Sequence, residues 1–254
     1  EYVIFLDSDD YWSGKENLLN MSKVIENNQD LDVLLFKRSY LYENSKQIKP
    51  SKLFESSKFL KLNKDQVFEE LINKEEFDVH SCLKVLKRTL LIENELYFKK
   101  GITGEDIEWY LRVLVHVKSL DSYNDPFYVY RAQRPGSITN KMGISNLIDM
   151  IETIEERFVH VQNKESKFTE LFVNCYKSYL AYQLTIIIGY YSYLDFKERE
   201  RIKKRILKLI PILKFDMYKK TKYIFSFYKI MGLILTSYIL GFYIKLRKKG
   251  KISL

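Results

Sequence analysis

Three carboxylates, Asp7, Asp9 and Asp10, follow directly after the apolar run 2–6. Carboxylates this close together repel one another, and they are poorly solvated beside a hydrophobic core. A bound divalent cation would relieve both problems, and carboxylate oxygens are ligands that suit Mg²⁺ or Mn²⁺. The alternative is a solvated acidic turn that ends a strand. A turn does not need three acids in this position, so the pattern favours a metal site.

Two further carboxylates, Glu105 and Asp106, follow a loop bracketed by Gly101 and Gly104 and begin a predicted helix. Acidic residues in the first turn interact favourably with the helix dipole, so capping alone would explain them. The functional alternative is a carboxylate aimed at a cleft, where it accepts a proton from a substrate hydroxyl. Trp109, one turn later, either belongs to the core or offers an apolar face to a sugar ring.

The sequence also contains cations placed where they could meet a phosphate. Lys84 interrupts the apolar run 82–86, which indicates either an edge strand or a cation that faces a phosphate. Arg131 and Arg134 lie in a Gly-containing loop, 131–139, with backbone amides and hydroxyls beside them. Such a loop could grip a diphosphate, although solvated surface arginines are the alternative.

The elements that must position these residues follow from periodicity. The run 2–6 has no polar alternation, which predicts a strand buried on both faces of a parallel α/β sheet. Ligands of such sheets gather at the carboxyl ends of the strands. Ser13 can cap a helix over 15–28, and a strand over 32–42 follows, so we expect a right-handed β-α-β crossover.

Between this unit and the second acidic pair, the pattern predicts alternating short elements. They are a polar surface excursion (43–64), a helix capped by Asn63 or Asp65 (65–73), a strand (81–86), a helical turn (88–94) and strand-like segments at 120–123 and 126–131.

The C-terminal part is predicted to be helical, over 144–162, 164–193 and 196–209, with Pro211 ending the third helix. The stretch 223–244 has Lys229 as its only charge and is long enough to span a bilayer. Basic residues flank it on both sides, which favours a helix that lies at an anionic membrane surface over a single span. A helix packed on the domain is a third alternative.

Charge is distributed unevenly along the 254 residues, whose net charge is +9. Residues 197–254 contain 17 Lys or Arg and 3 acids, a net charge of +14, so the rest carries −5. The asymmetry indicates a polyanionic partner, and the pairing of cations with long aliphatic runs favours lipid over nucleic acid.

Cys82 and Cys175 stand far apart, which argues for a reducing compartment. The chain begins within an apparent core strand without a signal peptide, so we expect a preceding part to be missing.

Together these motifs resemble the second half of a family 2 glycosyltransferase of the GT-A fold, over residues 1 to about 142. The motifs are, in order, Asp7-Ser8-Asp9-Asp10-Tyr11-Trp12, Lys84 before Arg88-Thr89-Leu90-Leu91, Gly104-Glu105-Asp106, Tyr130-Arg131 and Arg134-Pro135-Gly136-Ser137-Ile138. The resemblance implies a partial, Rossmann-like mixed α/β sheet with flanking helices (1–142), followed by an α-helical C-terminal region (143–254). The family's first half, with its nucleotide-binding strands, is absent.

The resemblance also implies roles. Asp7 and Asp9 form the DxD motif, which contacts the sugar nucleotide and holds Mg²⁺ or Mn²⁺ on its diphosphate. Asp106, beside Glu105, occupies the position of the catalytic base. Lys84 and Trp109 are the further substrate-binding candidates. Arg131 and Arg134 fall where the family places a mobile loop over the donor.

The implied function is metal-dependent, inverting transfer from a nucleotide sugar, UDP-linked by family frequency, to a hydroxyl of a glycan or lipid-linked acceptor. The expected setting is synthesis of a bacterial cell-surface polysaccharide at the cytoplasmic face of the membrane. One alternative is a non-catalytic membrane-binding module. Another is a haloacid dehalogenase-type phosphatase, which the Asp10-Tyr11 pair after Asp9 and the lack of a later Asp-Asp pair disfavour. An EF-hand loop fails because no Gly stands at its sixth position.

Overall fold

The structure is a computed structural model of the chain, and it describes all residues except 29, 43–45, 55–58, 60–61, 133–141 and 249–254. The chain divides into two compact units. Unit 1 comprises Glu1–Val67, Asp78–Lys100 and Glu105–Asn140, and unit 2 comprises Phe68–Phe77, Gly101–Gly104 and Lys141–Leu254. The predicted domain boundary at 142/143 stays a prediction.

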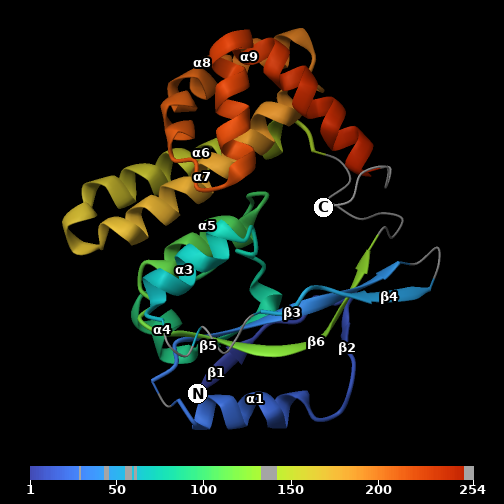
Figure 1. Cartoon of the computed structure of the whole chain (residues 1–254), viewed down its shortest axis with the longest axis vertical. Helices are drawn as coiled ribbons and strands as arrows, with labels where there is room; N and C mark the ends of the chain where they lie inside the picture. The colour runs from blue at the N-terminus through green and yellow to red at the C-terminus, as the bar shows by residue number, and fades with distance from the viewer. Residues whose placement is uncertain (29, 43–45, 55–58, 60–61, 133–141, 249–254) are drawn as a thin grey trace. The chain divides into compact units, whose positions relative to one another are not determined.

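A mixed sheet forms the centre of unit 1 (Figure 1). Its described strands are β1 (Tyr2–Ile4), β2 (Tyr11–Trp12), β3 (Val33–Tyr42), β4 (Gln47–Pro50), β5 (Lys84–Lys87) and β6 (Leu120–Ala132). The strand order is β1-β5-β3-β6-β2, and β4 pairs with the second half of β3. β3 and β6 are parallel, whereas the other pairs are antiparallel.

The first strand differs from the prediction of a strand buried on both faces of a parallel sheet. β1 pairs antiparallel with β5 and lies at the edge of the described sheet, so its residues are only half-buried and Leu6 is 51% exposed. An apolar run cannot specify which strand will lie beside it. The strand nevertheless runs in the direction that brings Asp7 to the same end of the sheet as the carboxyl ends of β3 and β6. β1 and β3 both run opposite to β5, so the carboxyl ends of β1, β3 and β6 share one edge.

Helices cover both faces of this sheet (Figure 1). The described helices that begin in unit 1 are α1 (Asn17–Glu26), α3 (Lys64–Asn73), α4 (Arg88–Glu93) and α5 (Glu105–Leu114), with a 3₁₀ turn, η1 (Ser81–Leu83). Leu34, Phe36 and Val85 pack in one core cluster with Met21 of α1. Because side chains alternate along a strand, Lys84 faces the opposite side of β5, toward Tyr110 of α5.

The N-termini of α3 and α1 show which of the predicted capping residues form hydrogen bonds to the helix. Asn63 caps α3 as predicted, since its Oδ1 accepts hydrogen bonds from the backbone amides of Asp65 and Gln66, each at 3.0 Å. Ser13 does not cap α1, which begins at Asn17, because its hydroxyl donates to the backbone carbonyl of Phe127 at 3.1 Å. A bond to a distant strand thus replaces the local cap.

Strand pairing also revised two other predictions. The polar excursion after β3 contains β4, which forms an exposed antiparallel pair with β3. The two short strands predicted near residue 125 are one long strand, β6, whose pairing with β3 shifts register between Phe36 and Arg38. In α1, Leu18 and Leu19 are each 57% exposed.

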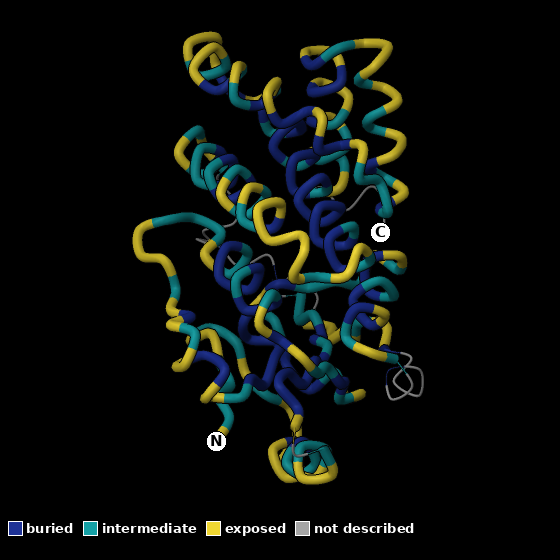
Figure 2. The backbone as a smooth tube through the Cα atoms, turned by 90° about the vertical axis from the view of Figure 1, so that its left-hand side faces the viewer, coloured by how far each residue is buried: buried dark blue, intermediate teal, exposed yellow. Residues whose placement is uncertain are grey.

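Unit 2 is largely helical, as predicted for the C-terminal region. Its later elements are α6 (Ile144–Asn163), η3 (Glu165–Lys167), α7 (Glu170–Tyr191), α8 (Phe196–Leu209), η4 (Ile210–Lys214) and α9 (Lys219–Lys248). α7 is buried along most of its length and appears largely dark blue in Figure 2. It starts later than predicted because Thr169 Oγ1 accepts a hydrogen bond from the amide of Phe172 and so begins the helix there.

The last helix, α9, is interrupted at Gly232, whose φ of 69° and ψ of −177° are not helical. Beyond this break α9 packs closely on α7. A Cβ at Gly189 would lie 2.5 Å from Ile244 Cδ1, and a Cβ at Gly241 would lie 2.0 Å from Ser192 Oγ. Glycine at both positions leaves room for this approach, because a larger residue would require the Ile244 or Ser192 side chain to shift. The helical stretch Lys219–Arg247 is long and apolar enough to cross a membrane. Among the described residues, no other helix meets these criteria of length and composition.

Candidate active site

The acidic loop after β1 is held in place by Asp10. Its Oδ2 accepts a hydrogen bond from Tyr128 Oη at 2.7 Å, and its Oδ1 accepts one from the backbone amide of Arg131 at 3.0 Å. The Tyr128 oxygen also accepts a hydrogen bond from the Asp7 amide at 3.4 Å. Asp10 therefore joins the loop to β6, a structural role that the sequence did not distinguish from those of Asp7 and Asp9.

Asp7 lies where negative charge accumulates. Partial burial raises the pKa of its carboxyl group, and the charges of Asp10 and Asp106 raise it further, while a hydrogen bond with the Cys82 side chain acts in the opposite direction. The two carboxylates that the sequence predicted for metal binding and for base catalysis thus lie near each other. A cation bound here would relieve the repulsion and favour the ionised form of Asp7.

Asp106 is half-buried in the first turn of α5, and Glu105 beside it is exposed. Asp106 Oδ1 accepts a hydrogen bond from the backbone amide of Ser81, at 3.2 Å. Ser81 begins the η1 turn that leads into β5, so this bond directs the carboxylate toward the carboxyl edge of the sheet. The geometry favours Asp106 over Glu105 as the oriented carboxylate.

Lys84 is not on an edge strand, in contrast to one of the two predictions, and its side chain is buried. β5 pairs with strands on both sides, and Lys84 is only 1% exposed. Its ammonium donates to the backbone carbonyl of His80 at 2.7 Å and lies 4.1 Å from the ring centre of Tyr110. Burial lowers the pKa of Lys84 to about 8, although Asp78 and Asp106 oppose that shift. Lys84 is therefore a cation buried beneath the site, with no access to a donor phosphate in this conformation.

The lowered pKa of Lys84 predicts how stability depends on pH. Between about pH 8 and the ordinary lysine pKa of 10.5, the folded state binds fewer protons at Lys84 than the unfolded state. The free energy of unfolding therefore gains a contribution that rises with pH across this window. We expect Lys84→Met to remove this rise, as measured by urea denaturation at several pH values. Lys100→Met, at an exposed position, should keep the wild-type slope, and an unchanged slope in Lys84→Met would contradict the burial argument.

Trp109 belongs to the core, which corrects the prediction of a sugar-binding face. It is 0% exposed, and its Nε1 donates to the backbone carbonyl of Leu96 at 2.8 Å. Its ring stacks on Phe98 with centroids 4.4 Å apart and meets the edge of Phe5 at 5.6 Å. Phe5 lies two residues before Asp7, so this aromatic cluster fixes α5, and with it Asp106, relative to the acidic loop.

An ion pair that sequence reasoning missed, between buried Arg38 and partly exposed Asp78, lies beside these residues. Arg38 is 6% exposed, and its NH2 group donates to Asp78 Oδ2 at 2.6 Å. Burial alone would raise the pKa of Asp78, but Arg38 and then His80 outweigh it, and the pKa lies well below its usual value. The only feature of the sequence that could have indicated this pair is an arginine, Arg38, within the predicted strand 32–42. Within the pair, Asp78 supplies a negative charge that favours the charged form of Lys84, whereas Arg38 opposes it.

The predicted arginine loop is described only in part. The Arg131 amide binds Asp10, which brings the end of β6 to the acidic loop, while Arg134 lies outside the described residues. The proposed grip on a diphosphate therefore stays a prediction.

Asp7 and Asp9 are the candidate ligands for a divalent metal ion. Among the described residues there is no group of three or more His, Cys, Asp or Glu side chains close enough to hold a metal ion. Asp7 and Asp9 supply only oxygen ligands, which suits Mg²⁺ or Mn²⁺ when bound phosphate and water complete the coordination. The residues thus fit a metal that arrives with a phosphate ligand, and they do not form a closed protein site.

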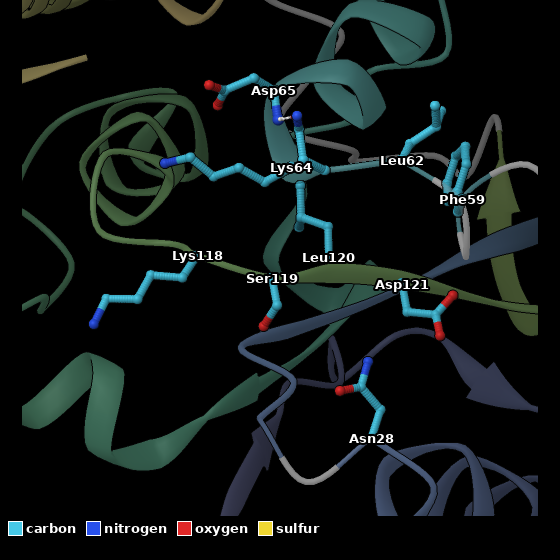
Figure 3. A pocket seen from close by; sticks show the side chains of 10 residues that line it. Asn28, Phe59, Leu62, Lys64, Asp65, Lys118, Ser119, Leu120 and Asp121 are labelled. Carbon is cyan, nitrogen blue, oxygen red and sulfur yellow. Dashed lines mark hydrogen bonds between the residues drawn. The ribbon is translucent and has the colours of Figure 1, made fainter. Parts of the chain in front are cut away.

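A cavity of about 290 Å³ lies elsewhere in unit 1 (Figure 3). It is lined by the start of α3, including Lys64 and Asp65, and by the start of β6, including Leu120 and Asp121. This is the opposite end of β6 from Arg131. Because ligands of α/β sheets bind at the carboxyl ends of the strands, we do not assign this cavity to the candidate active site.

The hydroxyl of Tyr128 gives a direct test of how the loop is held. Burial raises the pKa of Tyr128, so the group stays protonated and donates to Asp10. We expect Tyr128→Phe to lower the free energy of unfolding by about 1–3 kcal/mol, because a charged acceptor loses its partner. Urea denaturation measures the change. Tyr97→Phe, at a side chain that is 68% exposed, should cost less than about 0.5 kcal/mol, and equal effects would show that the Asp10 bond contributes no stability.

Comparison with known proteins identifies the fold. No protein-family model matches the chain, and no curated protein sequence matches it. Among solved structures, Staphylococcus aureus TarS residues 1–349 in complex with UDP-GlcNAc matches with a TM-score of 0.61 and 15% identity, covering 100% of this chain and 69% of that one. The same fragment with UDP gives 0.57 and 16%, with coverage of 100% and 68%.

A longer TarS crystal structure matches with a TM-score of 0.57 and 17% identity, covering 93% of this chain and 40% of that one. Identity at this level establishes the fold. The chain has the predicted class, a mixed α/β sheet of the GT-A type followed by C-terminal helices.

Proposed function

We propose that this chain carries catalytic residues of a metal-dependent, inverting glycosyltransferase. The observation that supports it best is the convergence of two carboxylates from distant elements. Asp7 follows β1 and Asp106 begins α5, yet the charge of Asp106 raises the pKa of Asp7. These residues lie at the end of the sheet where the carboxyl ends of the parallel strands meet. There, the acidic loop is suited to holding a cation, and Asp106 is suited to acting as a base, around one reacting carbon.

In the proposed reaction, Asp106 accepts the proton of an acceptor hydroxyl, and the backbone amide of Ser81 orients its carboxylate. The hydroxyl oxygen forms a bond to the anomeric carbon of the donor sugar from the face opposite the leaving group. The bond from that carbon to the diphosphate oxygen breaks, and the configuration inverts. Asp7 and Asp9 would hold Mg²⁺ or Mn²⁺, which when bound neutralises charge on the departing nucleoside diphosphate.

The donor we propose is a UDP-sugar, because TarS, which shares the fold, was crystallised with UDP-GlcNAc and with UDP. The acceptor we propose is a hydroxyl of a glycan or a lipid-linked sugar in bacterial cell-surface polysaccharide synthesis. This part of the proposal rests on the sequence resemblance and on the basic C-terminal region.

The test is turnover of UDP-GlcNAc and other UDP-sugars by the natural protein, with Mn²⁺. We expect release of UDP that stops when EDTA removes the metal and returns when Mn²⁺ is added in excess. If no common nucleotide sugar binds or turns over, the proposal fails and a non-catalytic membrane-binding module becomes the better explanation. Metal-dependent phosphate release from a phosphomonoester would instead favour a phosphatase.

A further inference from the structure

The last helix buries three small polar residues and exposes several of its large apolar ones. Thr221 is 0% exposed, and Thr236 and Ser237 are each 1% exposed, whereas Ile230 is 81% and Phe242 is 64% exposed. A helix on the surface of a protein in water normally shows the reverse pattern. The same helix is drawn largely yellow and teal in Figure 2. Its outward side therefore needs an apolar environment.

We call this outward side the α9 apolar face. Its members are Tyr223, Phe227, Ile230, Met231, Ile234, Leu235, Tyr238, Ile239 and Phe242. Steps of one, three and four residues separate them, which keeps them on one side of each helical segment. A contiguous apolar surface of this kind marks an interaction site.

The inward side of α9 has the packing found between helices whose outer faces meet lipid. Gly189 of α7 and Gly241 of α9 allow close approach of the two helices, and Tyr193 Oη donates to the carbonyl of Gly241 at 2.5 Å. Small residues at helix contacts with large aliphatic residues outside are typical of proteins in a bilayer.

Charge favours a lipid surface over a second copy of the chain. The sequence contains no Asp or Glu after Asp216. Among the residues of α9 whose burial is described, the exposed cations are Lys219, Lys222, Lys229, Lys245 and Arg247. Two copies meeting through this face would bring like charges together, whereas anionic headgroups complement them.

The break at Gly232 favours a helix that lies on the membrane over one that crosses it. At 1.5 Å per residue, the segments before and after the break are about 20 Å and about 24 Å long. Neither reaches the ~30 Å of the hydrocarbon core. Two short segments with apolar outer sides can both lie at the interface, where the apolar side chains enter the acyl boundary and the lysines reach the headgroups.

We infer that α9 docks this protein on the surface of an anionic lipid bilayer through the α9 apolar face, with the break at Gly232 keeping both segments in the interface. This attachment does not depend on the proposed glycosyl transfer.

The experiment is flotation of the natural protein with vesicles of phosphatidylcholine alone or mixed with phosphatidylglycerol. We expect binding to the mixed vesicles, and a loss of at least about tenfold when Ile230, Ile234 and Phe242 are all replaced by Ser. Replacing Lys222, Lys229 and Lys245 by Gln should weaken binding to anionic vesicles about 100-fold, at about fivefold per cation. The matched control replaces Leu18 and Leu19, exposed apolar residues of α1, by Ser and should bind like wild type.

Three outcomes would overturn the inference. Failure of wild type to float would do so, as would self-association in sedimentation that the Ile230, Ile234 and Phe242 replacements abolish, since the face would then join copies of the chain. Retention in vesicles after extraction with alkaline carbonate would instead indicate a span. Because flotation requires no donor, its result is independent of whether sugar transfer is detected. Circular dichroism and the unfolding midpoint check that each variant remains folded.

Discussion

Asp106→Asn should lower kcat about 10²–10⁴-fold, the usual contribution of a positioned general base. Asn keeps the shape of the side chain and can still accept the hydrogen bond from the Ser81 amide, so the fold and the KM for the donor should change little. Steady-state turnover of the nucleotide sugar measures the effect, and the unfolding midpoint reports on the fold. The prediction separates catalysis from helix capping, because a capping role would reduce stability and leave kcat nearly unchanged.

Two further variants sharpen this experiment. Glu105→Gln tests the neighbouring carboxylate, which is exposed, and we expect a much smaller loss of kcat than in Asp106→Asn. Asp125→Asn changes an exposed carboxylate of β6 and serves as the matched control. If Glu105→Gln were the more damaging substitution, the base would have to be reassigned to Glu105. If Asp106→Asn kept wild-type turnover, the proposed mechanism would be wrong.

Asp7→Asn should abolish most metal-dependent turnover and at the same time make the fold slightly more stable. Loss of a carboxylate that would hold the metal ion, which when bound neutralises charge on the leaving group, should cost about 10²–10³-fold in kcat. Its pKa is raised, so the folded state holds a proton to higher pH than the unfolded state does, and stability falls as pH rises above the ordinary aspartate pKa. Asn removes that repulsion, and we expect the Tm above this range to rise by about 1–2 °C.

The other members of the loop make this a three-way comparison. Asp9→Asn should also lower turnover and raise the Mn²⁺ concentration needed for half-maximal rate. Asp10→Asn should lower stability, because Asp10 accepts hydrogen bonds from Tyr128 and Arg131. Equal losses of stability in all three variants would indicate an acidic turn with only a structural role. Titration of wild type with Mn²⁺ at decreasing pH should show weaker binding, since protons compete for Asp7.

The site depends on contacts that lie outside the acidic residues. Phe5 and Trp109 tie the end of β1 to α5, Lys84 places a cation near Asp106, and Arg38 holds Asp78 beside Lys84. None of these four side chains needs to contact a substrate for the geometry to depend on it. A rigid aromatic and ionic support of this kind is how loops from different elements keep catalytic groups aligned.

Local features of the sequence determined which elements form and where the candidate acidic residues lie along them. The acidic residues after an apolar strand, the carboxylates in the first turn of α5 and the Asn63 cap were all predicted correctly, as were helices close to Ile144–Asn163 and Phe196–Leu209. Each of these depends on interactions within a few residues along the chain: helical periodicity, hydrogen bonds to free backbone amides, and the interruption by Pro211.

Tertiary structure decided which of the candidate residues are accessible and what each contacts. The edge position of β1, the burial of Lys84 and Trp109, and the role of Asp10 all depend on strands and helices that pack from far along the chain. The direction in which α9 turns its apolar side depends in the same way on its close contact with α7. Periodicity identifies a side of a helix or strand, but only packing determines whether that side meets the core, a ligand or a membrane.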